Sequence, residues 1–303
     1  MARNPAAQTA FGPMVQVAIE QYEPAEHRLV CDDLASSVLP AGQRALVRAM
    51  QWPLLRHLTI RAGERAVPGS WALINCRKRF IDDKLEEALG NIDAVVDLGA
   101  GMDTRAYRLA RRSDIPVFEV DLPVNIDRKR AAVQRAIDVL PASVHLVPLD
   151  FERDELMSTL TADGYRADAR TFFIWEGVTQ YLTEDAVRAT MAALQNAPAD
   201  SRLAFTYVRR DFIDGTNMHG AAILYKRFRQ RQQVWHFGLD PDAISGSWPN
   251  TAGDYSSRRD RITSWTTTFD RPVAISAHPS SSGRHTRRRS SPQSPSATGL
   301  RTP

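Results

Sequence analysis

The sequence predicts an α/β fold with a doubly wound parallel sheet. Four apolar segments follow one another along the chain, and each ends in a carboxylate: residues 94–97, 117–121, 145–150 and 172–176. Polar, helix-compatible stretches such as 125–140 and 153–160 separate them, which is the alternation typical of strand-helix-strand units. A Gly-x-Gly turn directly follows the first segment. Ligands bind beyond the carboxyl ends of the strands in such sheets, so the four acids are expected to ring one crevice.

The region before the first strand is predicted to be helical. Leu and Ala recur at helical spacing within 43–50 and 71–89, and prolines punctuate the chain between these segments. Gly90 is a suitable helix stop before the first strand. We therefore expect an N-terminal helical cap over residues 1–90.

The glycine turn is predicted to contact a ligand. Gly99 and Gly101 follow the buried strand that ends near Asp97, and glycines let the backbone approach a ligand closely. A helix predicted over 104–112 would point its amide donors at that ligand. The third glycine of the dinucleotide fingerprint is replaced by Thr104, which argues against a nicotinamide site.

The ring of strand-end carboxylates restricts the class of ligand. Carboxylates repel pyrophosphate, whereas they suit a ligand that carries positive charge and many hydrogen-bond donors. S-adenosylmethionine has ribose hydroxyls, an adenine amino group, an ammonium and a sulfonium. It is therefore the cofactor that this pattern favours.

A longer stretch of sequence points to a family. Residues 97–109 closely resemble the first motif of the leucine carboxyl methyltransferase-like S-adenosylmethionine-dependent methyltransferases, especially their actinobacterial branch. Three other blocks resemble this family in the same order: 77–83, 118–123 and 176–182. The resemblance covers roughly residues 15 to 245. It implies a Rossmann-like class I methyltransferase domain over 91–245, with a cap that covers the cofactor and shapes the acceptor pocket.

The first two strands carry the main candidates for cofactor binding. Asp121 lies twenty residues after Gly101, near the spacing at which an acid accepts hydrogen bonds from ribose hydroxyls. Gly99 and Gly101 are expected to contact the ligand. Asp97 either holds the methionine ammonium or caps the amides of the loop. Glu119 shares a strand face with Asp121, and it either assists or is a solvated acid.

Further candidates come from the resemblance. Asp150 and Phe151 match the adenine-recognition step, with Asp150 as a helix N-cap in the alternative interpretation. Glu176 would face the methionine ammonium or the sulfonium. Arg79 resembles the basic residue that clamps the methionine carboxylate, a bidentate task that suits guanidinium. Arg77 is the alternative, because both arginines lie on one short helical stretch.

The predicted activity is S-adenosylmethionine-dependent methyl transfer to an oxygen. The resemblance implies in-line displacement of the methyl group by a carboxylate or hydroxyl of an unidentified small-molecule or peptide acceptor. Alignment of two reactants can supply roughly 7–11 kcal/mol, so no catalytic base is nominated, and no metal site is expected. His145 is interpreted as structural. Acceptor choice is assigned to the cap and to residues 211–238, which include a basic helix over 225–231.

Composition is that of a cytoplasmic enzyme. The chain has 303 residues, of which 43% are hydrophobic, enough for one substantial core and a small cap. Cys31 and Cys76 show no metal-type spacing and are expected to be buried thiols. We expect no membrane span and no signal peptide.

The positive charge is concentrated at the C-terminal end. Residues 251–303 hold nine Arg, no Lys and three Asp, a local charge of +6 against a total of +4, so residues 1–250 carry −2. The basic isoelectric point is therefore a property of the tail. A nucleic-acid surface on the folded part is not expected.

The tail at 246–303 is predicted to be a disordered, low-complexity basic segment. It is rich in Ser, Pro and Arg and has little hydrophobic periodicity. Relatives continue after a block like 237–239 into a final strand pair, for which this chain shows no counterpart. We hypothesise that the reading frame shifts near Gly246; a genuine basic tail that binds acidic partners is the rival interpretation.

Two other outcomes remain open for the protein as a whole. Loss of the last strands would leave a catalytically impaired or unstable member of the family with an uncovered sheet edge. A nicotinamide-dependent dehydrogenase is the remote alternative, because the strand, glycine turn and distant acid are common to both classes.

Overall fold

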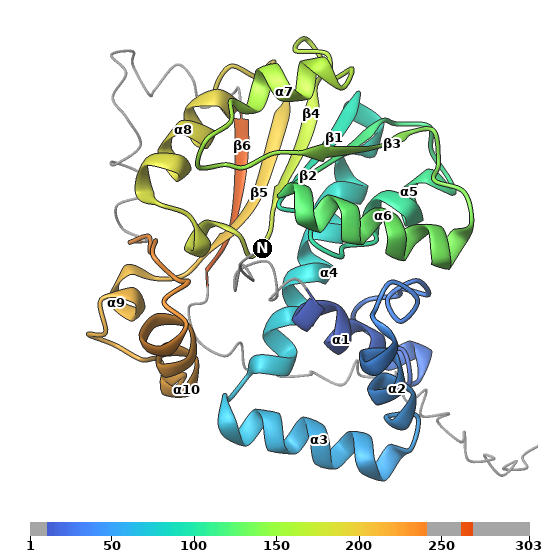
Figure 1. The fold of residues 1–303 in the computed structure, drawn as a ribbon, viewed down its shortest axis with the longest axis vertical. Helices are drawn as coiled ribbons and strands as arrows, with labels where there is room; N and C mark the ends of the chain where they lie inside the picture. The colour runs from blue at the N-terminus through green and yellow to red at the C-terminus, as the bar shows by residue number, and fades with distance from the viewer. Residues whose placement is uncertain (1–10, 241–261, 269–303) are drawn as a thin grey trace, which may run out of the picture. The chain divides into compact units, whose positions relative to one another are not determined.

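The computed structural model describes residues 11–240 and the backbone of residues 262–268. Its centre is a six-stranded sheet of order β3-β2-β1-β4-β5-β6 (Figure 1), in which every neighbouring pair is parallel. The strands are β1 Ala94–Leu98, β2 Val117–Asp121, β3 Val144–Pro148, β4 Thr171–Trp175, β5 Ser201–Tyr207 and β6 Ile262–Thr268. The order reverses between β1 and β4, which makes the predicted doubly wound sheet with its switch point beside the glycine turn.

The helices fall into three groups along the chain. Those before the sheet are α1 Phe11–Glu20, α2 Ala41–Ala49, α3 Pro53–Ala66 and α4 Ser70–Ala88, with short 3-10 turns at η2 Ala25–His27 and η3 Leu89–Asn91. Those between strands are α5 Arg105–Ala110, α6 Pro123–Ile137, α7 Leu156–Ala162, η4 Thr179–Tyr181 and α8 Glu184–Leu194. Those after β5 are α9 Arg210–Ile213, α10 Ala222–Leu224 and the π-helical η5 Tyr225–Arg231.

Local sequence explains several helix starts. Proline occupies the first turn of α3 and of α6, where its missing N–H costs nothing. The Thr183 side chain caps α8 by accepting from the Ala186 amide at 3.2 Å. Gly69 precedes α4 with a φ of 80°, a left-handed conformation that turns the chain from α3 into α4. That turn directs α4 along the sheet.

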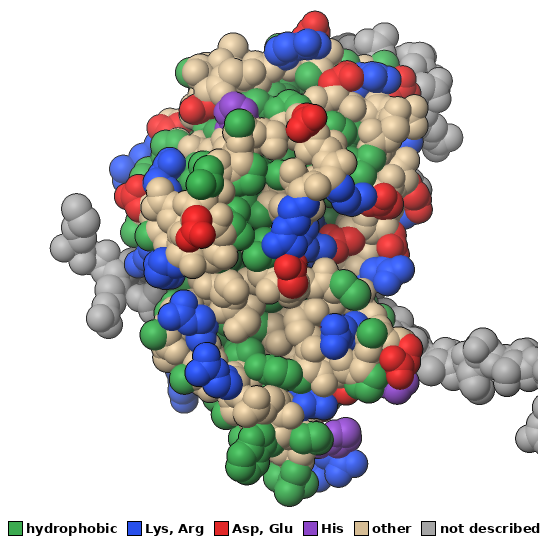
Figure 2. Space-filling view, turned by 90° about the vertical axis from the view of Figure 1, so that its right-hand side faces the viewer, with side chains coloured by type: hydrophobic (Ala, Val, Ile, Leu, Met, Phe, Trp, Pro, Cys, Tyr) green, Lys and Arg blue, Asp and Glu red, His purple; other side chains and the backbone are tan. Residues whose placement is uncertain are grey.

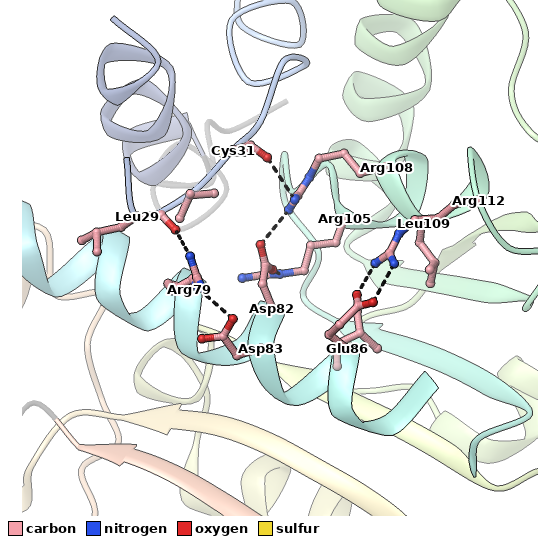
Figure 3. A pocket seen from close by; sticks show the side chains of 12 residues that line it. Leu29, Cys31, Arg79, Asp82, Asp83, Glu86, Arg105, Arg108, Leu109 and Arg112 are labelled. Carbon is pink, nitrogen blue, oxygen red and sulfur yellow. Dashed lines mark hydrogen bonds and ion pairs between the residues drawn. The ribbon is translucent and has the colours of Figure 1, made fainter. Parts of the chain in front are cut away.

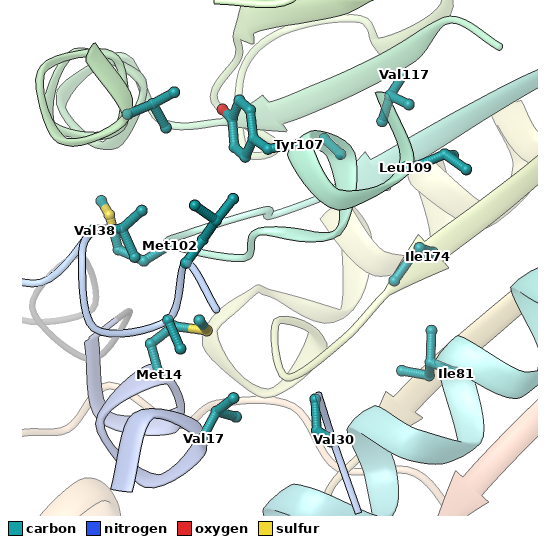
Figure 4. Packing of buried hydrophobic residues seen from close by; sticks show 14 of the residues in the cluster. Met14, Val17, Val30, Val38, Ile81, Met102, Tyr107, Leu109, Val117 and Ile174 are labelled. Carbon is teal, nitrogen blue, oxygen red and sulfur yellow. The ribbon is translucent and has the colours of Figure 1, made fainter. Parts of the chain in front are cut away.

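The two faces of the sheet are covered by different helices. Side chains alternate along each strand, so Ile174 joins a core with α1, α4, α5 and α6, whereas Phe173 and Trp175 join a second core with α7 and α8. Figure 4 shows the first core, where Met14 lies below Met102 and Tyr107, and Ile81 of α4 lies below Ile174. The cap and the sheet therefore share one hydrophobic core.

Not all of the cap is buried. Five large hydrophobic side chains at α2 and α3 are exposed: Leu46, Trp52, Leu54, Leu55 and Leu58. Figure 2 shows hydrophobic surface gathered at the end of the molecule where α3 lies. Cys31, in the loop between α1 and α2, is exposed and Cys76 is half-buried; both are free thiols. The expectation of two buried thiols is therefore wrong for Cys31, which lies on a surface loop.

One strand lies where the sequence analysis expected none. The backbone of β6 pairs with β5 from Ser201↔Ile262 to Tyr207↔Thr268. The β6 sequence, ITSWTTT, is rich in β-branched and aromatic residues that favour strands, and β5 would otherwise offer an unpaired edge. The rest of the predicted tail over 246–303 lies outside the described residues, as does the proposed frame shift at Gly246. The helices of the described part are all too short or too polar to span a membrane.

Candidate functional site

The glycine turn after β1 has the conformation that only glycine adopts readily. Gly99 has a φ of 75° and Gly101 a φ of 48°, both in the left-handed region. A Cβ atom on Gly99 would lie 2.3 Å from Cγ2 of Val178, which follows β4. Gly99 is therefore required for close packing of the two loops that follow β1 and β4.

Asp121 holds the glycine turn from the neighbouring strand. Its Oδ2 accepts a hydrogen bond from the Gly101 amide at 2.7 Å, and its Oδ1 accepts from the Leu122 amide at 2.7 Å and from Nδ2 of Asn125 at 2.8 Å. Burial raises the pKa of Asp121, although these hydrogen bonds act in the opposite direction. A carboxylate oxygen has two acceptor sites, so Oδ2 can accept one further hydrogen bond from a ligand.

A buried ion pair lies beneath the same turn. Glu119 is fully buried and pairs with Nζ of Lys129, and it accepts from the Tyr107 hydroxyl at 2.6 Å. Nζ of Lys129 also donates to the carbonyl of Ala100, inside the turn, at 3.4 Å. The interpretation of Glu119 as a solvated acid is therefore wrong, because Glu119 is buried and paired with Lys129 from α6, which also supports the turn through the Ala100 carbonyl.

Asp97 lies beside this ion pair on β1, in register with Glu119. It is buried, and its pKa lies well above the ordinary value because burial and the nearby charge of Asp103 disfavour ionisation. Such an acid keeps its proton more readily than an exposed one. The structure therefore places Asp97 at the predicted edge of the sheet with an environment that favours its neutral form.

Glu176 is the centre of a buried charge cluster at the end of β4. Its Oε1 accepts from Nε of Arg77 at 2.7 Å, and its Oε2 accepts from Arg105 at 2.7 Å and lies 3.5 Å from Nζ of Lys78. Lys78 also donates to Asp103 at 2.9 Å. Burial raises the pKa of Glu176, but the three cations outweigh burial and lower this pKa to about 2. Glu176 is therefore a permanent anion surrounded by donors.

Arg79 is the predicted site residue that the structure keeps apart from this cluster. Its side chain is 54% exposed and pairs with Asp83, one turn along α4, at 2.7 Å. Residues two positions apart on a helix point in different directions, so α4 presents Arg77 to Glu176 and Arg79 to the opposite side. Of the two arginines, the structure therefore places the alternative, Arg77, beside Glu176 and leaves Arg79 outside this cluster.

Arg79 instead borders a cavity of about 240 Å³ between α4, α5 and the loop at 29–31. The arginines of this cavity are engaged with the protein itself (Figure 3): Arg79 with Asp83 and the Leu29 carbonyl, Arg108 with Asp82, and Arg112 with Glu86. Gly101, Asp121 and Glu176 do not line it. This cavity is therefore not the crevice at the strand ends.

Asp150 and Phe151 lie in the loop after β3, next to the end of β2. The Leu149 amide donates to the Asp121 carbonyl at 2.8 Å, which joins the two loops. Oδ1 of Asp150 accepts from the Glu152 amide at 3.1 Å, whereas the N-cap of α7 is Glu155. Asp150 therefore closes a turn and does not cap the helix, which corrects the alternative interpretation. The Phe151 ring packs 6.3 Å from that of Trp175.

Several residues of the site escaped the sequence analysis. Arg105 is 4% exposed and pairs with three acids: Asp82, Asp103 and Glu176. Lys78 and Lys129 also take part in buried ion pairs. For Arg105 and Lys78 the available signal was a basic residue inside a matched block, next to acids that need a partner when buried; Lys129 lies outside these blocks.

Groups suited to binding two different parts of a ligand lie at one edge of the sheet. Near β1 and β2, a glycine turn and Asp121 offer a backbone surface and an acceptor. Near β4, a fixed anion at Glu176 is flanked by Arg77 and Lys78. A ligand with a hydroxyl-bearing part and an amino-acid part would match this arrangement, because carboxylate and ammonium each find an oppositely charged partner.

Similar proteins were found by sequence. A protein of Streptomyces coelicolor named as a candidate S-adenosyl-L-methionine-dependent methyltransferase is 36% identical over 140 residues, covering 46% of this chain and 49% of that protein. A Mycobacterium marinum protein of the same name is 32% identical over 206 residues, covering 58% and 68%. The chain thus spans between about half and two thirds of the length of these relatives.

Solved structures resemble the chain only in part. A DUF574 family protein from Streptomyces avermitilis is 12% identical, covers 61% of this chain and 72% of its own, and has a TM-score of 0.43. An O-methyltransferase family protein from Burkholderia thailandensis is 17% identical, covers 57% and 52%, and has a TM-score of 0.37.

The sequence family described as leucine carboxyl methyltransferase matches residues 10–195. This match takes in more than half of the chain, from α1 to the end of α8, and so includes the cap, the glycine turn and the Glu176 cluster. The chain belongs to the leucine carboxyl methyltransferase family.

Proposed function

We propose that the protein is an S-adenosylmethionine-dependent methyltransferase that transfers the methyl group to an acceptor oxygen. The observation that carries this proposal is the pairing, at one switch point, of a glycine turn tied to Asp121 with an anion at Glu176 flanked by Arg77 and Lys78. Family membership and the names of the relatives support it.

Each part of the cofactor has a suitable partner among these residues. Asp121 would accept from the ribose hydroxyls while the Gly99–Gly101 turn approaches the nucleoside. Asp150 would accept from the adenine amino group, and Phe151 would pack against the ring. Arg77 and Lys78 would hold the methionine carboxylate, while Glu176 would hold the ammonium. When bound, the cofactor supplies a methyl group activated by a sulfonium.

The chain's own contribution to the reaction is binding and alignment. The cluster around Glu176 fixes charges before a ligand arrives, so little reorganisation is required on binding. The buried cations and carboxylates of this cluster neutralise each other before a ligand binds, so their burial is compatible with folding. The cations are Arg77, Lys78 and Arg105. An acceptor oxygen held in line with the methyl group would then gain the effective concentration that alignment provides.

The acceptor is proposed to be a small molecule or peptide that offers a carboxylate or hydroxyl. The proposed location of the reaction is the cytoplasm. Thr104 stands where the dinucleotide fingerprint has its third glycine, which argues against a nicotinamide-dependent reaction. The names of the relatives also support methyl transfer.

Calorimetric titration of the full chain with S-adenosylmethionine, S-adenosylhomocysteine and NAD tests the proposal. We expect saturable binding of the two methionine nucleosides and no binding of NAD. A folded, monodisperse sample that binds neither nucleoside would refute the cofactor assignment, and it would favour the alternative of an impaired family member.

A further inference from the structure

A second pocket, of about 90 Å³, lies between the cap and the segment that follows β5. Its walls are mainly apolar, and residues of both segments contribute to them: Val67 and Leu73 from the cap, and Val208, Phe212, Ala221 and Leu224 from the segment after β5. An apolar cavity of about 150 Å³ holds benzene, so a single small ring is the most that this smaller pocket can take.

The pocket adjoins elements that also carry the candidate cofactor site. Leu73 precedes Arg77 by one turn of α4, and residues at this spacing lie on the same helix face. Val208 directly follows β5, which pairs with β4, and Glu176 is the residue after β4. The ring of Tyr181, in the turn that follows Glu176, lies 6.4 Å from the ring of Trp235 in the pocket wall. The pocket and the candidate cofactor site therefore share α4 and the β4–β5 pair.

Two of the residues that line the pocket, Phe212 and Trp235, are aromatic, and each packs against a further ring behind the wall. Trp235 stacks on Phe228 with ring centroids 4.7 Å apart, and it lies 6.0 Å from the ring of Phe212. Tyr225 packs edge-on against Phe212 at 5.7 Å. Aromatic rings prefer such offset and edge-to-face neighbours, so this wall is suited to a ligand that is itself aromatic.

Polar groups are few and have a definite arrangement. Nε2 of His219 lies 3.0 Å and 3.1 Å from the two carboxylate oxygens of Asp211, to which Arg209 also donates at 3.2 Å. When Nε2 carries the proton shared with Asp211, Nδ1 is left with a lone pair. The indole Nε1 of Trp235 is buried without a hydrogen-bond partner among the described residues.

His219 has a strained backbone. Its φ is 46°, a conformation that is uncommon for residues other than glycine and that concentrates at functional sites. Burial acts to raise the pKa of Asp211, but hydrogen bonds from His219 and Arg209 outweigh it and hold this pKa below the ordinary value. Asp211 is thus an anion that orients the imidazole.

We propose that this pocket binds the methyl acceptor, that the acceptor is a small phenol, and that His219, oriented by Asp211, takes up the proton of its hydroxyl. The proposal rests on the proposed methyltransferase function and names its substrate class. A carboxylate acceptor is already ionised and requires no base, whereas a phenol has an ordinary pKa near 10 and gains from one. Trp235 supplies a donor for a second oxygen.

The step balances in atoms and charge. The phenolic oxygen forms a bond to the methyl carbon as the bond between that carbon and sulfur breaks, and the bonding pair stays on sulfur. The hydroxyl proton moves to Nδ1 of His219 and then to solvent. The products are a methyl ether, neutral S-adenosylhomocysteine and one proton.

Binding is tested with 4-methylphenol as the probe, by calorimetric titration of the full chain saturated with S-adenosylhomocysteine. We expect saturable binding in the wild type and at least a tenfold loss in Ala221→Trp, which fills the pocket. Ile223→Trp is the matched control, because Ile223 lies two residues further along the chain, in α10, and is exposed; it should bind as the wild type does. Absence of binding in the wild type, or equal losses in both variants, overturns the pocket assignment.

Proton transfer is tested by methylation of 4-methylphenol and of 4-nitrophenol, which is largely ionised at mildly alkaline pH. In His219→Gln we expect the rate for 4-methylphenol to fall about 100-fold, with the rate for 4-nitrophenol within about threefold of the wild type. Asp211→Asn, a positioning variant, should show the same selectivity with KM unchanged. Equal losses for both phenols would overturn the role of His219.

These experiments separate the two proposals. A protein that binds S-adenosylhomocysteine but not 4-methylphenol retains the proposed function and loses the acceptor assignment. A protein that binds no methionine nucleoside loses the proposed function itself.

Discussion

At the residue scale, Asp121 has one observed role and one proposed role. It fixes the glycine turn through the Gly101 amide, and it is the proposed acceptor for ribose hydroxyls. A carboxylate can do both because each oxygen accepts more than one hydrogen bond. The consequence is that the turn is already shaped when the ligand arrives, so cofactor binding does not have to order it.

Asp121→Ala is expected to weaken S-adenosylmethionine binding about 10- to 100-fold, since hydrogen bonds to a charged group contribute roughly 1.5–3 kcal/mol. Calorimetric titration measures the affinity, and the unfolding temperature of the variant controls for loss of the fold. An affinity like that of the wild type would contradict the role of Asp121.

Arg77 and Arg79 offer a matched pair on one helix. Arg77 is buried against Glu176, whereas Arg79 is half exposed and pairs with Asp83. Arg77→Ala should therefore lower affinity for S-adenosylmethionine at least tenfold, because a charge-assisted partner is lost. Arg79→Ala should remain within about twofold, since exposed ion pairs contribute little. The reverse order of effects, measured by the same titration, would restore the family-based assignment to Arg79.

At the scale of elements, α6 and β2 are joined by the Glu119–Lys129 ion pair. Both side chains are almost fully buried, and the Tyr107 hydroxyl from α5 completes the arrangement. Buried pairs of this kind add little to stability by themselves, but removal of one partner strands the other charge. Because of this ion pair, the position of the glycine turn depends on how α5 and α6 pack against the sheet.

Lys129→Met is expected to reduce the free energy of unfolding by about 3–5 kcal/mol, because Glu119 would be left buried without its cation. Urea unfolding measures this loss. The double variant with Glu119→Gln should recover part of the stability, since the stranded charge is gone. A single variant as stable as the wild type would show that the pair does not support the turn.

At the scale of the whole molecule, the sheet depends on its last strand to cover β5. β6 pairs with β5 over its full length, and without β6 the strand β5 would lie at the edge of the sheet with a row of unpaired backbone groups. The chain therefore needs the 262–268 segment even though the family match ends at residue 195.

Truncation after Asp240 should lower the unfolding temperature and promote association, because it removes β6. Truncation after Val273 retains β6 and is the matched control. Calorimetric unfolding and size-exclusion chromatography provide the measurements. Equal behaviour of the two truncated proteins would show that β6 contributes nothing to the fold.

The sequence by itself predicted the first four strands, their parallel topology and the edge of the sheet at which the candidate site lies. These predictions rest on local patterns, because the apolar strands, the intervening helices and the Gly99–Gly101 turn each consist of consecutive residues. The sequence also indicated Asp121, Glu176 and the alternative Arg77 as candidates, since each stands at a strand end or inside a matched block. The family membership was predicted on the same residues.

The tertiary structure alone decided which side chains meet. Arg105 and Lys78 converge on Glu176 from different elements, and residue types do not reveal which face of a helix points inward when several charges share it. The same holds for His219 and Asp211, which meet the cap only through folding. The physical reason is burial: a charge removed from water must find a partner, and only the packed chain determines which partner is within reach.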